Sequence, residues 1–219
     1  MTVTSGEAPA DPASVRRSEP DYQFDFCGGH AAVDFTNTVG NRGGVPEEHL
    51  NTFGDLAAWA QGRGILSRVQ AARLRRRAAA SPGEARRALG RAIELRDILY
   101  DVMARRASGT TVPADLICRL NRYVTGTFGR ARLEPAGSRF DLSTPPAGEF
   151  DAVLTPVVRA AVDLLTSDAA GHLGMCADST CAWLFLDTTR NRTRRWCDMK
   201  ACGNRNKVRR FRRAVEHPI

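Results

Sequence analysis

Apolar side chains recur every three or four residues along several long segments of the chain. In the longest of these the repeat runs from Leu89 to Met103, and we expect Arg96 either to be half-buried in it or to flank it. A repeat near 3.6 residues is typical of a helix that turns one face toward a core. The same pattern predicts a helix after Val112-Pro113 and another over 153–165. We therefore expect a mainly helical domain.

Helix-start signals support this prediction between residues 52 and 84. In a capping box, the hydroxyl of the residue before the helix accepts a hydrogen bond from the backbone amide three residues later. The side chain of that later residue in turn accepts a hydrogen bond from the backbone amide of the first. Three pairs fit the pattern: Thr52 with Asp55, Ser67 with Gln70, and Ser81 with Glu84. Pro82 also suits the first turn of a helix. The sequence thus predicts three successive helices here.

Small β elements are predicted where apolar and polar residues alternate. Aromatic residues alternate with polar ones over 22–26 and predict a strand before the Gly28-Gly29 turn. Residues 31–39 fit a helix or a strand, and we favour a helix. Short alternating pieces on either side of 135–137 predict a hairpin.

Composition divides the chain into three parts. Residues 1–20 are rich in Pro, Ala, Ser and charge without a hydrophobic period, which predicts a disordered arm. A helical domain is expected over 21–167, and 167–174 is interpreted as a linker to a small C-terminal domain over 171–219. The expected fold class is mainly α with small β elements (α+β).

The chain shows no signal for a membrane or for export. No apolar run approaches the roughly 18 residues that suggest a membrane span, and the first residues lack the apolar stretch of a secretory signal. We expect a cytoplasmic protein that does not associate with membranes.

Four cysteines near the C-terminus form two C-x4-C pairs, Cys176 with Cys181 and Cys197 with Cys202. Paired thiolates are typical of tetrahedral zinc sites, so we predict that these four side chains bind Zn²⁺. An iron–sulfur cluster or a redox disulfide would also use such thiols, but the hairpin and helix predicted around the pairs favour structural zinc. Cys27 and Cys118 belong to no pair, and we expect them to be small core residues.

A hairpin and a helix are predicted within the C-terminal domain. Residues 182–186 favour a strand, 188–193 form a polar turn, and 194–196 lead into the second cysteine pair. Beyond that pair an apolar stripe at spacings of three and four predicts a helix; its members are Val208, Phe211 and Val215. We expect this stripe to cover the aromatic residues Trp183, Phe185 and Trp196.

Positive charge is concentrated in the same region. Residues 187–219 contain eleven Lys and Arg against three Asp and Glu, a balance of 11 − 3 = +8, which equals the charge of the whole chain. Such a field attracts polyanions, so we predict that this region binds double-stranded DNA. The candidate contact residues are Arg192, Arg194, Arg195, Lys200, Arg205, Lys207, Arg209, Arg210, Arg212 and Arg213. A merely solvated basic face is the alternative.

The residues around the second pair resemble the signature of CGNR zinc fingers. Residues 195–205 read RWCDMKACGNR and contain the literal string Cys202-Gly203-Asn204-Arg205. Residues 26–39 are similar to the opening motif of ABATE domains, the mostly helical N-terminal partners of these fingers, and 89–99 are similar to their long helix. The resemblance implies a zinc-dependent regulator of transcription in a stress response.

From this resemblance we expect a DNA-binding transcription regulator whose N-terminal domain senses an effector, with a homodimer also considered. Asp34, Asn37 and Arg42 could line an effector pocket, although a structural role is the simpler interpretation. The alternatives are a zinc-stabilised module that contacts protein or RNA, and a thiol switch in which oxidation releases the metal. The sequence contains no nucleophile elbow, phosphate-binding loop or paired-His motif, so we do not expect an enzyme.

Overall fold

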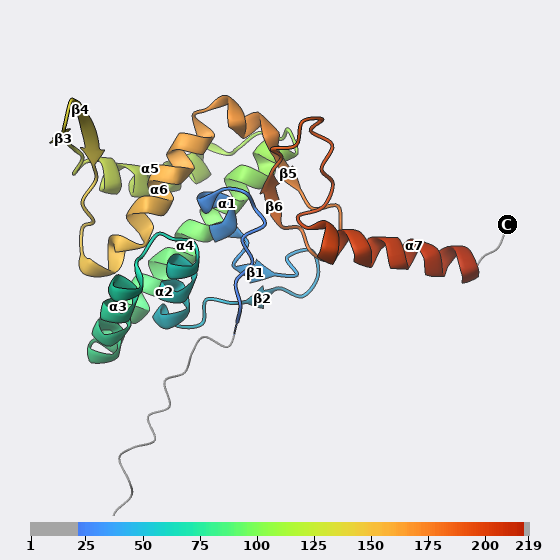
Figure 1. Ribbon diagram of the computed structural model, residues 1–219, viewed down its shortest axis with the longest axis horizontal. Helices are drawn as coiled ribbons and strands as arrows, with labels where there is room; N and C mark the ends of the chain where they lie inside the picture. Colours follow the sequence, from blue (N-terminus) through green and yellow to red (C-terminus); the bar gives the residue numbers. More distant parts are fainter. Residues whose placement is uncertain (1–21, 217–219) are drawn as a thin grey trace, which may run out of the picture.

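The computed structural model describes residues 22–216, and the arm predicted over 1–20 lies outside this range. The described helices are α1 (Ala31–Thr36), α2 (Phe53–Gly62), α3 (Arg68–Ala80), α4 (Pro82–Ala107), α5 (Ala114–Phe128), α6 (Leu154–Leu165) and α7 (Asn204–Glu216). The strands are β1 (Val39–Gly40), β2 (Glu47–Glu48), β3 (Arg132–Ala136), β4 (Arg139–Ser143), β5 (Leu173–Met175) and β6 (Leu184–Leu186). Short helical turns are η1 (Glu149–Ala152), η2 (Asp168–His172) and the π-helical η3 (Met199–Gly203). The fold is mainly helical with small antiparallel sheets (Figure 1), which confirms the predicted class.

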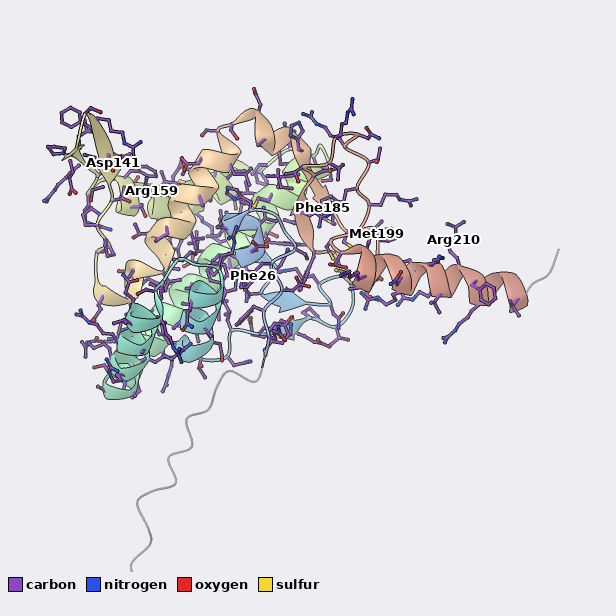
Figure 2. All side chains as sticks on the ribbon, in the orientation of Figure 1. Phe26, Asp141, Arg159, Phe185, Met199 and Arg210 are labelled. Carbon is purple, nitrogen blue, oxygen red and sulfur yellow. The ribbon has the colours of Figure 1, made fainter. Side chains whose placement is uncertain are left out.

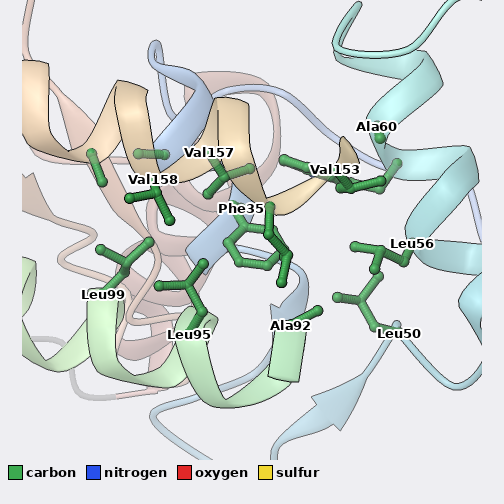
Figure 3. Close-up of a cluster of buried hydrophobic side chains, with 14 of the residues drawn as sticks. Phe35, Leu50, Leu56, Ala60, Ala92, Leu95, Leu99, Val153, Val157 and Val158 are labelled. Atoms are coloured by element: carbon green, nitrogen blue, oxygen red, sulfur yellow. The ribbon is translucent and has the colours of Figure 1, made fainter. Parts of the chain in front are cut away.

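Helix α4 lies at the centre of the helical domain. It contacts α1, α2, α3 and α5, while α6 packs on α1 and α5. Phe35 of α1 is fully buried and lies among Leu95 and Leu99 of α4 and Val157 of α6 (Figure 3). The apolar faces predicted for α4 and α6 therefore meet in one core. Among the described residues, no helix combines the length and the apolar character needed to cross a membrane.

Two of the three predicted capping boxes are confirmed. Thr52 with Asp55 and Ser67 with Gln70 make both reciprocal hydrogen bonds, at the starts of α2 and α3. The third prediction is wrong, because Ser81 makes no side-chain cap for α4. Ser81 is the only residue between α3 and α4, and Arg77 of α3 donates to its hydroxyl and pairs with Glu84 at 2.9 Å.

The strand predicted over 22–26 is also wrong. These residues form no ladder; the Tyr22 ring stacks on His49 with centroids 3.6 Å apart, and Phe24 and Phe26 pack against the core. The alternation reflects a segment whose aromatic side packs against the protein while Gln23 and Asp25 are exposed. The following helix is confirmed as α1, which ends at Thr36, and Val39 lies in β1.

Two side chains differ in burial from the expectation. Arg96 is 2% exposed in the middle of α4, where Glu48 accepts a hydrogen bond from its Nη1 at 2.6 Å and Asp97 accepts one from its Nε at 3.0 Å. Burial of this guanidinium is tolerated because both carboxylates pair with it. Cys118 was expected in the core but is exposed on α5.

The C-terminal hairpin is built onto the helical core. Residues 167–174, predicted to be a linker, form η2 and β5, and β5 pairs with β6 in the register Leu173 to Leu186. The strand predicted over 182–186 is confirmed as β6, and its hairpin partner is the preceding β5. Leu173, Leu184 and Leu186 belong to the same buried cluster as the helices, so the hairpin gains its stability there.

Candidate metal centre

The two cysteine pairs converge on one point. Cys176, Cys181, Cys197 and Cys202 are all buried, and their Sγ atoms lie within 4.8 Å of one another. Zinc with Zn–S bonds of about 2.3 Å holds tetrahedral sulfurs about 3.8 Å apart. The Sγ atom of Cys197 is 3.6 Å from those of both Cys181 and Cys202. The donor set therefore fits Zn²⁺, and four protein ligands complete a closed structural site.

Backbone hydrogen bonds hold the two cysteine turns together. The Cys176 amide donates to the Trp183 carbonyl at 2.8 Å, and the Ala177 amide donates to the Arg195 carbonyl at 2.8 Å. In the second turn the Asp198 carboxylate accepts from the amides of Lys200 and Ala201, which starts η3. These contacts bring together sulfurs from turns about twenty residues apart in the sequence.

Gly203 lies in the second turn beneath the Met199 side chain. A Cβ at Gly203 would lie 2.7 Å from the Met199 sulfur and 3.3 Å from the Trp196 ring. Because Met199 is exposed and its side chain can move, a small residue suits this position without glycine being required. Asn204 donates to the Lys200 carbonyl at 3.1 Å and supports the same turn.

The sulfur cluster is electrostatically supported from α7. Hydrogen bonds from the thiols of Cys181 and Cys197 hold the pKa of the Cys176 thiol below its usual range. Arg205 donates from Nη2 to the Cys202 sulfur at 2.9 Å. Four thiolates and one Zn²⁺ carry a formal charge of −2, which a neighbouring guanidinium stabilises.

Asp178 connects the first cysteine turn to α7. Its side chain is fully buried, and it accepts hydrogen bonds from Thr180, from Arg205 at 2.9 Å and from Asn206 at 2.8 Å. Arg209 adds an ion pair at 3.4 Å. Burial raises the pKa of Asp178, but the Thr180 hydrogen bonds and the Arg205 charge outweigh it and lower that pKa to about 2. The carboxylate stays charged and holds one face of α7 against the cysteine turn.

The apolar stripe on α7 covers nothing in the described part of the chain. Val208, Phe211 and Val215 are 48%, 71% and 63% exposed, and α7 extends away from the body (Figure 1). The prediction that this stripe packs on Trp183, Phe185 and Trp196 is wrong, because Asp178 binds the polar face of α7 instead. Phe185 is buried beside the cysteines and beneath the Arg194 guanidinium, which is 4.6 Å from its ring centre.

The predicted nucleic-acid residues fall into two groups. Arg205 and Arg209 bind Asp178, and Arg194 donates to the carbonyls of Cys27, Trp196 and Cys197, so these three have partners within the chain. The others are exposed: Arg192, Arg195, Lys200, Lys207, Arg210 and Arg212. Figure 2 shows Arg210 extending from α7 into open space. Arg213 lies in α7, but its side chain is outside the described set.

The candidate effector residues contact other parts of the protein. Asp34 is 1% exposed, pairs with Arg63 at 2.7 Å and accepts from the Gly28 amide at 2.8 Å. Burial raises the pKa of Asp34 to about 6 despite the opposing charge of Arg63. Arg42 pairs with Asp97 at 3.1 Å and lies 4.0 Å above the ring centre of Tyr100.

Asn37 joins the helical domain to the hairpin. It is 4% exposed, its Nδ2 donates to the Leu184 carbonyl at 2.9 Å, and its Oδ1 accepts from the Leu184 amide at 3.0 Å. This side chain therefore satisfies both backbone groups of a buried strand residue, as a neighbouring strand would. We name this pair of hydrogen bonds the Asn37 clamp.

Further contacts join the same two regions, and sequence reasoning missed them. The Tyr100 hydroxyl donates to the Ala182 carbonyl at 2.9 Å, and the Trp183 indole donates to the Val39 carbonyl at 2.7 Å. A Cβ at Gly43 would lie 2.1 Å from the Ser179 carbonyl oxygen, so only glycine permits this approach. The loop at Gly43 is thus packed on the first cysteine turn.

Comparison with known families agrees with this organisation. The ABATE family model, described as “Putative stress-induced transcription regulator”, matches residues 29–168. The CGNR zinc finger model matches residues 172–214, which include all four cysteines. No curated protein matches the chain.

Proposed function

The chain belongs to the ABATE family and carries a zinc-binding CGNR finger, and from this premise we propose that it regulates transcription by binding double-stranded DNA through α7. The observation that carries the proposal is the exposed basic surface of α7 on a zinc-stabilised base. Its free cations include Lys207, Arg210 and Arg212. In this proposal it acts as a cytoplasmic, non-catalytic protein.

Charge and shape both support DNA as the partner. The four cysteines lie within residues 171–219, where eleven Lys and Arg stand against four Asp and Glu, a surplus of 11 − 4 = +7; the zinc tetrathiolate contributes −2 and leaves about +5. A 13-residue helix is about 20 Å long, and the B-DNA major groove is wide enough to admit one. Because α7 extends from the body, it can enter a groove ahead of the helical domain (Figure 1).

Regulation would reach α7 through the junction between the two regions. An effector that displaced α1 or α4 would act on the Asn37 clamp and on the Tyr100 contact, both of which hold the hairpin. The chain that follows this hairpin carries the cysteines and α7. The proposal thus includes an effector-sensing N-terminal domain, and a homodimer would place two copies of α7 on adjacent half-sites.

The test is duplex binding by the zinc-loaded full chain over a range of salt. About five phosphate contacts give a slope near −4.5, which lowers affinity roughly 500-fold between 50 and 200 mM salt. The double variant Arg210→Glu with Arg212→Glu should lose duplex binding and keep its zinc. Arg86→Glu with Arg87→Glu changes the same charge at two exposed residues of α4 and is the matched control. The proposal would be refuted if both double variants lost the same amount of duplex affinity, or if the affinity of the wild-type chain did not change with salt concentration.

A further inference from the structure

Helix α7 is amphipathic, but its polar face contacts the protein and its apolar face is exposed, the reverse of an ordinary surface helix. Its polar residues Arg205, Asn206 and Arg209 face Asp178 and the body of the protein. Counting about 100° per residue, the centre of the stripe at Val208, Phe211 and Val215 lies roughly 130° around the helix from that face. The apolar stripe is therefore directed outward. Phe211 is its most exposed member, at 71%.

Charge limits what can cover this stripe. Lys207 and Arg212 lie on either side of it, and both are exposed. Two copies of α7 packed along the stripe would bring these cations against each other, which is destabilising. The partner must instead be anionic at its edges and apolar at its centre. The major groove of DNA has this character, since phosphates form its rims and thymine methyl groups project into it.

On the basis of the proposed DNA binding, we infer that Phe211, with Val208, recognises thymine C5-methyl groups in the major groove. Asp178 turns the stripe toward the groove by holding the opposite face of α7. Lys207 and Arg212 contact the phosphates on the two sides. Phe211 and Val208 are then specificity-determining residues, whereas the arginines provide affinity without sequence preference.

The experiment replaces thymine by uracil in a bound duplex, which removes only the methyl group. The duplex is first selected from a random pool with the zinc-loaded full chain, and each thymine is then exchanged in turn. Burial of one methyl is worth about 0.8 kcal/mol, or roughly fourfold in affinity. We expect at least one thymine whose exchange weakens binding by about that factor, and no such effect of the same exchange in Phe211→Ala.

The controls separate this inference from the proposed function. Phe211 is exposed, so Phe211→Ala should retain the fold and the zinc; Val208→Ala provides a second, milder variant. If the wild-type chain binds no duplex, the proposed function fails. If it binds but every exchange leaves affinity unchanged, DNA binding stands and methyl recognition is overturned. If removal of the methyl group still weakens binding by both alanine variants, methyl recognition is also overturned. The same holds if the wild-type chain self-associates and Phe211→Ala loses this self-association while its affinity for DNA stays unchanged.

Discussion

The Asn37 clamp offers the sharpest test of how the finger is attached. Asn37→Ala removes the donor and the acceptor that bind the Leu184 backbone, and both groups of Leu184 are buried. Leaving a buried backbone group without a partner costs about 1 to 3 kcal/mol. Two such groups predict a loss of about 2 to 6 kcal/mol in the free energy of unfolding, a large part of the stability of an ordinary domain.

The assay is denaturant unfolding at saturating zinc, followed by helical circular dichroism and by tryptophan fluorescence. Trp59 lies in the helical core and Trp183 beside the cysteines, so coincident transitions indicate one cooperative unit. Asn51→Ala is the matched control, because Asn51 is exposed and the variant removes the hydrogen bond from its side chain to the Glu48 carbonyl while its backbone amide still donates to Asp55. We expect a loss of about 0.5 kcal/mol there. If Asn37→Ala costs no more than Asn51→Ala, the clamp does not hold the two regions together.

Removal of zinc by a chelator should lower the melting temperature of the helical domain as well, because the hairpin shares its core; an unchanged melting curve would contradict this. Asp178→Asn should retain stoichiometric zinc but speed amide hydrogen exchange in the first turns of α7, since it weakens the bonds from Arg205 and Asn206, and unchanged exchange would refute the anchoring role. The Asp34 carboxyl should titrate near pH 6 by NMR, above its usual value near 4. Because the native state then binds a proton that the unfolded state lacks, this group adds stability as pH falls from 6 toward 4, and a midpoint below 4 would exclude this effect.

Local signals in the sequence predicted local structure well. The capping boxes at Thr52 and Ser67 depend on residues three apart, so their chemistry is visible in a short window. The thiol spacing similarly identified a zinc site, because few other arrangements use two such pairs. The capping box predicted at Ser81 is wrong because Ser81 both ends α3 and precedes α4, and its hydroxyl accepts a hydrogen bond from Arg77 of α3.

Long-range pairing could not be predicted in the same way. Nothing near Asn37 marks it as a partner for a strand that begins more than 140 residues later, and β6 could have paired on either side. The outward stripe on α7 was misread because apolar spacing identifies a face without showing its direction. That direction depends on Asp178, a single buried carboxylate in another turn.

The position of the Asn37 clamp also affects the order of folding during synthesis. Asn37 and Leu184 are separated by 147 residues. At a translation rate of roughly 5 to 20 residues per second, Leu184 is synthesised about 7 to 30 seconds after Asn37. The nascent helices must stay soluble during that interval with the surface for the hairpin uncovered. Zinc binding needs Cys202, which is synthesised after Leu184, so a shortage of zinc would leave the cysteine turns unstabilised after the hairpin has been made.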